Sequence, residues 1–330
     1  MNTQNRDESE ERDGRSDSRR AFMLGAAALG AGLVAGCSPE QPPRPGRSQG
    51  RISAPGQYIT SDGAMLNFIE AGSGTPLVLI PGWSQTAAMF RAQIDAFSAN
   101  YRVIAVDMRG HGGSSKTSYG YRIARLALDV NELMEALELD KVTIAGHSMG
   151  CSVIWSYWDQ FGGHRISKII LIDQAPTVVF WPDWTDEQKQ VAGALFDAKG
   201  LYDTAAGIAG ADGAKVTEDV VRGLFFTKAY PKEKADFALA ENLKFPRQHA
   251  ARLLVDHCTQ DWRDTIPRIG VPTLVVGGKA SFFHPKSQEW IASQIAGARV
   301  EIFEEDEGGG HFMFMENPEK FNRIVAEFLA

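Results

Sequence analysis

A serine flanked by glycines stands where a predicted strand meets a predicted helix. Residues 145–150, AGHSMG, begin within the predicted strand KVTIAG (141–146) and lead into a helical pattern over 149–161. In such a strand–turn–helix the glycines let the two elements pass closely, and the turn presents the serine hydroxyl at the carboxyl edge of a sheet. Amides at the start of the helix favour negative charge there. We therefore predict that Ser148 is a catalytic nucleophile.

A serine nucleophile needs an adjacent base, and His311 is the histidine best placed to provide it. It follows the run EEDEGGG, after the last predicted strand and before the last predicted helix. In a doubly wound sheet that loop returns to the carboxyl edge, where ligands bind. His111 and His147 stand beside turns and are interpreted as structural. Surface or core positions are assigned to His164, His249, His257 and His284.

These two residues require a sheet whose strands alternate with helices. Strands are predicted at 76–80, 102–107, 141–146, 168–173, 273–277 and 299–303, and the continuous apolar run at 76–80 is typical of a strand buried on both faces. Helical patterns lie at 89–97, 121–138, 149–161, 286–296 and 318–329. A hairpin signal at 61–63 precedes them. We predict an α/β fold with a doubly wound, mostly parallel sheet.

The alternation stops after the predicted strand 168–173, which is the sixth when the two strands of the hairpin are counted. The segment 180–262 is helical in pattern and rich in aromatic residues. We predict that it is a helical lid over the carboxyl edge, inserted between two parts of one core, 57–179 and 263–330.

The N-terminus has a different composition. Arg19 and Arg20 precede an apolar run that ends at Cys37, and this run is shorter than the about 20 residues of a membrane span. The pattern is typical of a secretory signal; the arginine pair resembles a twin-arginine signal, and LVAGC resembles a bacterial lipobox. We predict a signal segment at 1–36, a lipidated Cys37 and a flexible tether at 37–56. The protein would then be an exported lipoprotein, anchored to a cell-envelope membrane and facing the periplasm or the outside.

Composition narrows the partners and cofactors. With 330 residues, 44% of them apolar, the chain can bury a large core, and its net charge of −7 without long basic runs argues against nucleic acid. Cys151 and Cys258 lie in apolar helical patterns and are interpreted as packed thiols. No metal-ligand spacing of cysteines or histidines is present. We expect neither a metal nor a cofactor.

The order Ser148 then His311, with PGW after an early strand, resembles the α/β-hydrolase family over about residues 57–330. VDMRGHGGSS at 106–115 and ENPEKFNRIVAEFL near the C-terminus are similar to the family's conserved turn and closing helix. The resemblance is to lidded, cofactor-free serine hydrolases, which include carboxylesterases, lactonases, carbon–carbon bond hydrolases and perhydrolase-type haloperoxidases. Epoxide hydrolases and haloalkane dehalogenases use an aspartate nucleophile, so Ser148 argues against both.

The resemblance also implies an oxyanion hole made by the amides of Trp83 and Met149. The family usually has His-Gly where this chain has Pro81-Gly82, and the required donor stands one residue further on. In the substrate pocket we expect Gln85, Trp181 and Trp184.

The acid that orients the histidine is displaced from its usual place. In most of the family it stands about three residues past the glycine that ends the seventh strand, and counting from Gly278 reaches Ser281. Asp173, at the end of the neighbouring strand about 4.8 Å away, is the expected replacement. The alternatives are Glu304, Glu305, Asp306 and Glu307, just before the histidine.

The leading hypothesis is a carboxylic ester hydrolase that cleaves an apolar small ester or lactone through an acyl-enzyme. The alternatives are a carbon–carbon bond hydrolase, a cofactor-free perhydrolase or haloperoxidase, and a catalytically silent hydrolase-fold lipoprotein that binds a ligand. The absence of an acid at Ser281 is the feature that favours the silent protein. Neither the substrate nor the oligomeric state follows from the sequence.

Overall fold

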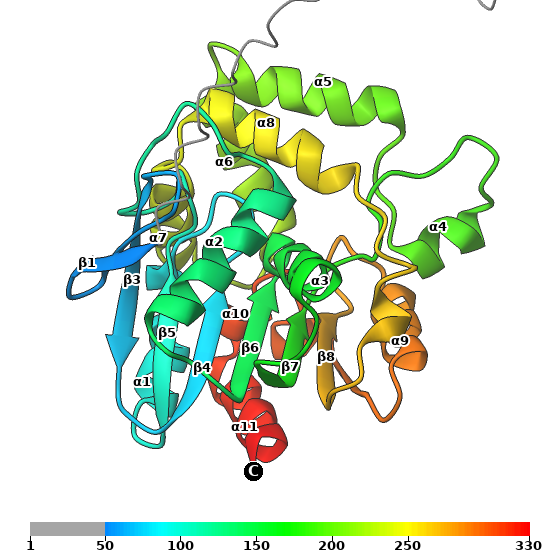
Figure 1. Cartoon of the computed structure of the whole chain (residues 1–330). Coiled ribbons are helices and arrows are strands. Elements are labelled where there is room, and N and C mark those ends of the chain that lie inside the picture. The colour runs from blue at the N-terminus through cyan, green and yellow to red at the C-terminus, as the bar shows by residue number, and fades with distance from the viewer. Residues whose placement is uncertain (1–49) are drawn as a thin grey trace, which may run out of the picture. The chain divides into compact units, whose positions relative to one another are not determined.

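One sheet organises the part of the chain that the computed structural model describes, residues 50–330 (Figure 1). Its nine strands follow the order β1-β2-β3-β5-β4-β6-β7-β8-β9. From β5 to β9 neighbouring strands run parallel, whereas β1, β2 and β3 pair antiparallel. The predicted fold class is thus confirmed. The strands are β1 (Arg51–Ala54), β2 (Gln57–Ile59), β3 (Met65–Ala71), β4 (Thr75–Ile80), β5 (Tyr101–Val106), β6 (Val142–His147), β7 (Ile166–Ile172), β8 (Thr273–Gly278) and β9 (Arg299–Phe303).

Only the last part of the predicted N-terminal tether lies within the described residues. The signal segment 1–36, Cys37 and the tether as far as residue 49 lie outside the described residues, so lipidation and export stay predictions. The predicted tether, 37–56, extends too far, because residues 51–54 form β1, which pairs antiparallel with β2. Its side chains are mostly exposed, so this edge strand carries no apolar pattern by which it could be recognised. Within 50–330, no helix has both the length and the apolar character needed to cross a membrane.

Helices cover both faces of the sheet (Figure 1). Successive residues of a strand point to opposite faces. On β4, Val78 and Ile80 belong to the core under α2 (Ile123–Ala136) and α3 (Met149–Phe161). Leu77 and Leu79 belong to the opposite core, under α1 (Arg91–Phe97) and α11 (Pro318–Leu329). This double covering explains why the strand reads as a continuous apolar run. The single-turn elements are η1 (Ala87–Phe90), η2 (Ile266–Arg268), η3 (Glu305–Glu307) and α10 (Met313–Glu316), and α9 (Pro285–Gln294) packs beside β8.

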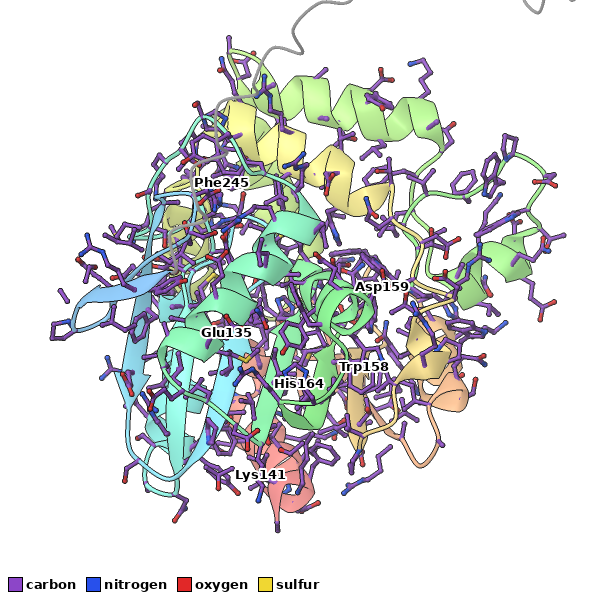
Figure 2. The ribbon with its side chains drawn as sticks, in the orientation of Figure 1. Glu135, Lys141, Trp158, Asp159, His164 and Phe245 are labelled. Carbon is purple, nitrogen blue, oxygen red and sulfur yellow. The ribbon has the colours of Figure 1, made fainter. Side chains whose placement is uncertain are left out.

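The lid (residues 180–262) consists of helices. In Figure 1, α5 and α8 lie above the end of the sheet to which β6 points, whereas α4 lies to the side and packs against α9. Phe245, labelled in Figure 2, joins the lid to the core by packing on His111 and Tyr121, with ring centroids 4.2 and 5.4 Å apart. The lid helices are α4 (Asp186–Ala192), α5 (Ala198–Ala209), α6 (Gly213–Leu224), α7 (Lys232–Asn242) and α8 (Arg247–Cys258).

A buried ion pair supports the loop that follows β5. Arg109 and Asp129 are both fully buried and joined at 2.8 Å, and the partly exposed Asp62 makes a second bond to the arginine. The same loop carries His111, whose Nε2 accepts a hydrogen bond from the amide of Ser84 at 3.1 Å. The ion pair therefore supports a histidine that holds the chain next to Trp83.

We expect Asp129→Ala to be strongly destabilising, because it leaves the buried Arg109 guanidinium without its main partner. The free energy of unfolding from urea titration should fall by about 3–5 kcal/mol. The exposed pair of Arg91 and Asp95 provides the control, and Asp95→Ala should change it by less than about 1 kcal/mol. Equal effects of the two variants would contradict this assignment.

Candidate active site

Ser148 occupies a strained turn between β6 and α3. Its backbone has φ 53° and ψ −125°, outside the regions that non-glycine residues prefer. A Cβ at Gly146 would lie 2.5 Å from the backbone of Gly150, and one at Gly150 would lie 2.4 Å from the carbonyl oxygen of Ile80. The two glycines thus permit the close passage of strand and helix that the sequence predicted.

His311 and Asp173 meet beneath the lid. Nδ1 of His311 lies 2.6 Å from Oδ2 of Asp173, and both side chains are buried. Asp173 directly follows β7, with a φ of 50°, and His311 lies in the loop between β9 and α10. Because Nδ1 donates its proton to the carboxylate, Nε2 remains free to accept one, and it has no hydrogen-bond partner among residues 50–330.

The alternative acids lie elsewhere. Glu304 pairs with Lys279 at 2.7 Å, and Glu307 pairs with Lys320. Glu305 and Asp306 are exposed. The structure therefore brings Asp173, and none of these four residues, to the histidine.

Ser281 supports the carboxylate that replaces the usual acid. Its hydroxyl donates to Oδ2 of Asp173 at 2.5 Å and accepts from the amide of Phe283 at 3.2 Å. Burial raises the pKa of Asp173 well above its ordinary value, while hydrogen bonds from Ser281 and the backbone of Gly278 act to lower it. Burial lowers the pKa of His311 to about 3, so its ring is neutral, as a general base requires.

Two backbone amides lie near Ser148. Met149 is the first residue of α3, so its amide has no carbonyl partner within the helix. A Cβ at Gly82 would lie 2.8 Å from Cβ of Ser148, so the oxyanion loop (residues 81–85) runs directly against the nucleophile. This brings the next residue, Trp83, to the same place. The arrangement suits the oxyanion hole that the resemblance implied.

The prediction that Gln85 contacts substrate is wrong. Its side chain is buried, and its Oε1 accepts from the amide of Gly82 at 2.9 Å. The same oxygen lies 2.8 Å from Nδ1 of His147, whose Nε2 lies 2.8 Å from the carbonyl oxygen of His311. Gln85 is short enough to fold back onto its own loop, so it braces the loop and leaves the pocket to other residues.

A cavity of about 420 Å³ adjoins Ser148 beneath the lid. Apolar side chains dominate its lining, with Leu224 and Leu254 from the lid and Phe282 and Phe283 from the loop after β8. Its size and apolar lining are typical of small-molecule sites. A larger hollow of about 850 Å³ lies at the surface of α5 and α8, and Ser148 is not among the residues that line it.

The prediction that Trp181 and Trp184 line the pocket is also wrong. Trp181 is 67% exposed, and Trp184 borders a separate hollow, where its ring lies 4.8 Å from the guanidinium of Arg263. Both stand next to α4, which packs beside the sheet on α9 and not over the carboxyl edge.

Sequence reasoning missed other residues of the site. Phe282 and Phe283 directly follow Ser281, in the loop where the family usually has its acid, and both line the cavity. His257 was assigned to the core or surface, yet it lines the cavity. Its spacing from Leu254 on α8 is the signal that could have placed both on one helix face.

Comparison with known proteins agrees with this geometry. The sequence model described as alpha/beta hydrolase fold matches residues 75–318. The chain belongs to this family. This α/β hydrolase is 29% identical in sequence to a non-heme chloroperoxidase of Kitasatospora aureofaciens, and the match covers 82% of this chain and 98% of that protein. The esterase EaEST of Exiguobacterium antarcticum is 29% identical, with a TM-score of 0.73 over 82% of this chain and 97% of that one. An enol-lactonase of Burkholderia xenovorans LB400 shares the fold, with a TM-score of 0.69 and 23% identity over 81% and 96% of the two chains.

We expect Asp173→Asn to lower kcat of this α/β hydrolase by roughly 10²–10⁴-fold, because the amide cannot compensate the charge that forms on His311. Hydrolysis of an activated ester measures the loss, and circular dichroism checks the fold. Ser281→Asp in the Asp173→Asn background restores a carboxylate beside the same site and should recover part of the activity. Near wild-type turnover of Asp173→Asn would show that the acid lies elsewhere.

Ser281→Ala should shift the pH profile. The hydroxyl stabilises the ionised Asp173, so its removal raises the pKa of a carboxyl that burial has already raised. The ionised form is then lost at a higher pH as the pH falls, and the acid limb of kcat/KM moves upward. At pH 8 the loss should stay below about tenfold, since the serine acts only through the acid. Ser293→Ala, at an exposed position, is the control; identical profiles for the two variants would refute the role.

Proposed function

We propose that the protein is a serine hydrolase that cleaves a carboxylic ester or lactone of an apolar small molecule. The observation that carries the proposal is a neutral His311, bound to Asp173 and with a free Nε2, under the same lid as an apolar cavity that reaches Ser148. The family and the similarity to EaEST, an esterase, support it.

The chemistry follows from these groups. The Ser148 hydroxyl attacks the acyl carbonyl while Nε2 of His311 takes its proton, and the amides of Trp83 and Met149 stabilise the oxyanion. Collapse of the tetrahedral intermediate breaks the acyl–oxygen bond, and the histidine returns the proton to the departing alcohol. Water, activated by the same histidine, then attacks the acyl-serine and releases the acid. Asp173 stabilises the imidazolium in both halves.

A perhydrolase is the second candidate, because a non-heme chloroperoxidase matches 82% of this chain. Hydrogen peroxide would replace water as the nucleophile on the acyl-serine and would release a peracid and the free serine. The hypothesis of a catalytically silent binding protein loses its main argument, since Asp173 supplies the carboxylate that position 281 lacks.

We expect a fluorophosphonate probe to label the wild-type protein at Ser148 and to leave Ser148→Ala unlabelled. The labelled protein should hydrolyse p-nitrophenyl esters, and Ser148→Ala should lose at least about 10³-fold in kcat. Peptide mapping locates the label, and the same assay with hydrogen peroxide measures how the acyl-enzyme divides between acid and peracid. A folded wild-type protein that neither reacts with the probe nor hydrolyses any ester would refute the hydrolase and support a binding role.

A further inference from the structure

His257 is a polar side chain without a partner in an apolar cavity. It lies in the last turn of α8 and is only 5% exposed, yet it lines the cavity together with Ser148. Its buried Nδ1 has no hydrogen bond within residues 50–330, and neither has its Nε2. Thr204 also borders the cavity, but its hydroxyl donates to the carbonyl of Gly200 at 2.8 Å.

Among the buried histidines this is unusual, whereas other buried polar atoms without a partner in residues 50–330 include Nε1 of Trp155 and Oη of Tyr157. Among residues 50–330 four histidines are buried: His111, His147, His257 and His311. Both nitrogens of His111 have partners, at 2.9 and 3.1 Å, and both nitrogens of His147 have neighbours at 2.8 Å. His311 leaves one nitrogen unpaired, and that nitrogen is the proposed base. Since buried polar groups in proteins are normally paired, the unpaired ring of His257 needs an explanation.

The ring has the hydrogen-bonding capacity of a neutral imidazole. Burial, followed by the electrostatic influence of the nearby His311, lowers the pKa of His257 to about 3, so the ring is neutral at neutral pH. A neutral imidazole offers one donor and one acceptor. A hydroxyl group can pair with either nitrogen, as a donor to the unprotonated one or as an acceptor from the protonated one, whereas an alkyl group pairs with neither.

We propose that His257 is a specificity-determining residue that binds a hydroxyl group of the substrate inside the apolar cavity. The inference rests on the proposed hydrolase function and narrows its substrate class to hydroxylated esters and lactones. The scissile carbonyl would lie at Ser148 and the hydroxyl beside His257, because both residues line the same cavity. His257 does not replace the base, because Asp173 is bound to His311.

The test compares pairs of substrates that differ by one hydroxyl. The panel contains p-nitrophenyl alkanoates and their hydroxyalkanoate counterparts, alkyl butyrates and their hydroxyalkyl counterparts, and lactones with and without a ring hydroxyl. The wild-type enzyme should prefer at least one hydroxylated member by about tenfold or more in kcat/KM. In His257→Leu that ratio should fall to about 1, and in His257→Gln, which keeps a donor and an acceptor, part of it should remain.

Controls separate recognition from folding and from catalysis. Leu254→Ala, on the same helix face, should change both members of each pair by similar factors. Thermal unfolding and the rate of fluorophosphonate labelling show whether a variant keeps its fold and its nucleophile, and His257→Met replaces the leucine variant if that variant does not fold.

Unchanged ratios in a folded His257→Leu or His257→Met, or a wild-type enzyme that prefers no hydroxylated member, would overturn the role of His257 and leave the hydrolase standing. Absence of labelling and of all hydrolysis in the wild type would instead overturn the hydrolase, and this inference with it.

Discussion

The hydrogen bond between Asp173 and His311 is the constraint on which the site depends. It joins the end of β7 to the loop after β9, with β8 between them in the sheet. Closing that distance requires the loops to press together: a Cβ at Gly278 would lie 2.1 Å from the carbonyl oxygen of Gly309. The same oxygen accepts a hydrogen bond from the amide of Ala280 at 2.9 Å. The glycines at the end of β8 and before the histidine are therefore needed for this one contact.

A second chain of contacts connects the histidine loop to the oxyanion loop. The carbonyl of His311 adjoins His147, His147 adjoins Gln85, and Gln85 holds the amide of Gly82. His147 is next to the nucleophile in sequence, so all three parts of the proposed machinery meet around one turn. A displacement of any of these loops would disturb the other two, because their interiors are close-packed and cannot deform independently.

The sequence correctly predicts the site residues that stand at or after the ends of strands. It fails for residues whose place in the site depends on the direction of a side chain. Ser148 and Asp173 directly follow apolar strands, and His311 lies in the loop after the last strand, so the topology of the sheet brings the three residues to one edge. The lid has no strands that could fix the positions of its residues in the same way. Trp181 and Trp184 have the composition of a pocket wall, but α4 docks beside the sheet, and that choice depends on packing against α9. Gln85 points inward for a similar reason, since its side chain accepts a hydrogen bond from the amide of Gly82 in its own loop.

Several unfavourable features of the fold meet at the site. Ser148 and Asp173 both have positive φ, the carboxyl of Asp173 is buried, and His257 is buried without a partner. Each is unfavourable in isolation, and the large cores on both faces of the sheet stabilise the fold against them. Strain and the buried carboxyl are accounted for by the Ser148–His311–Asp173 arrangement itself. The unpaired ring of His257 is not, because that arrangement is complete without it. A hydrogen-bonding substrate in the cavity is the one partner proposed here that would make this ring favourable.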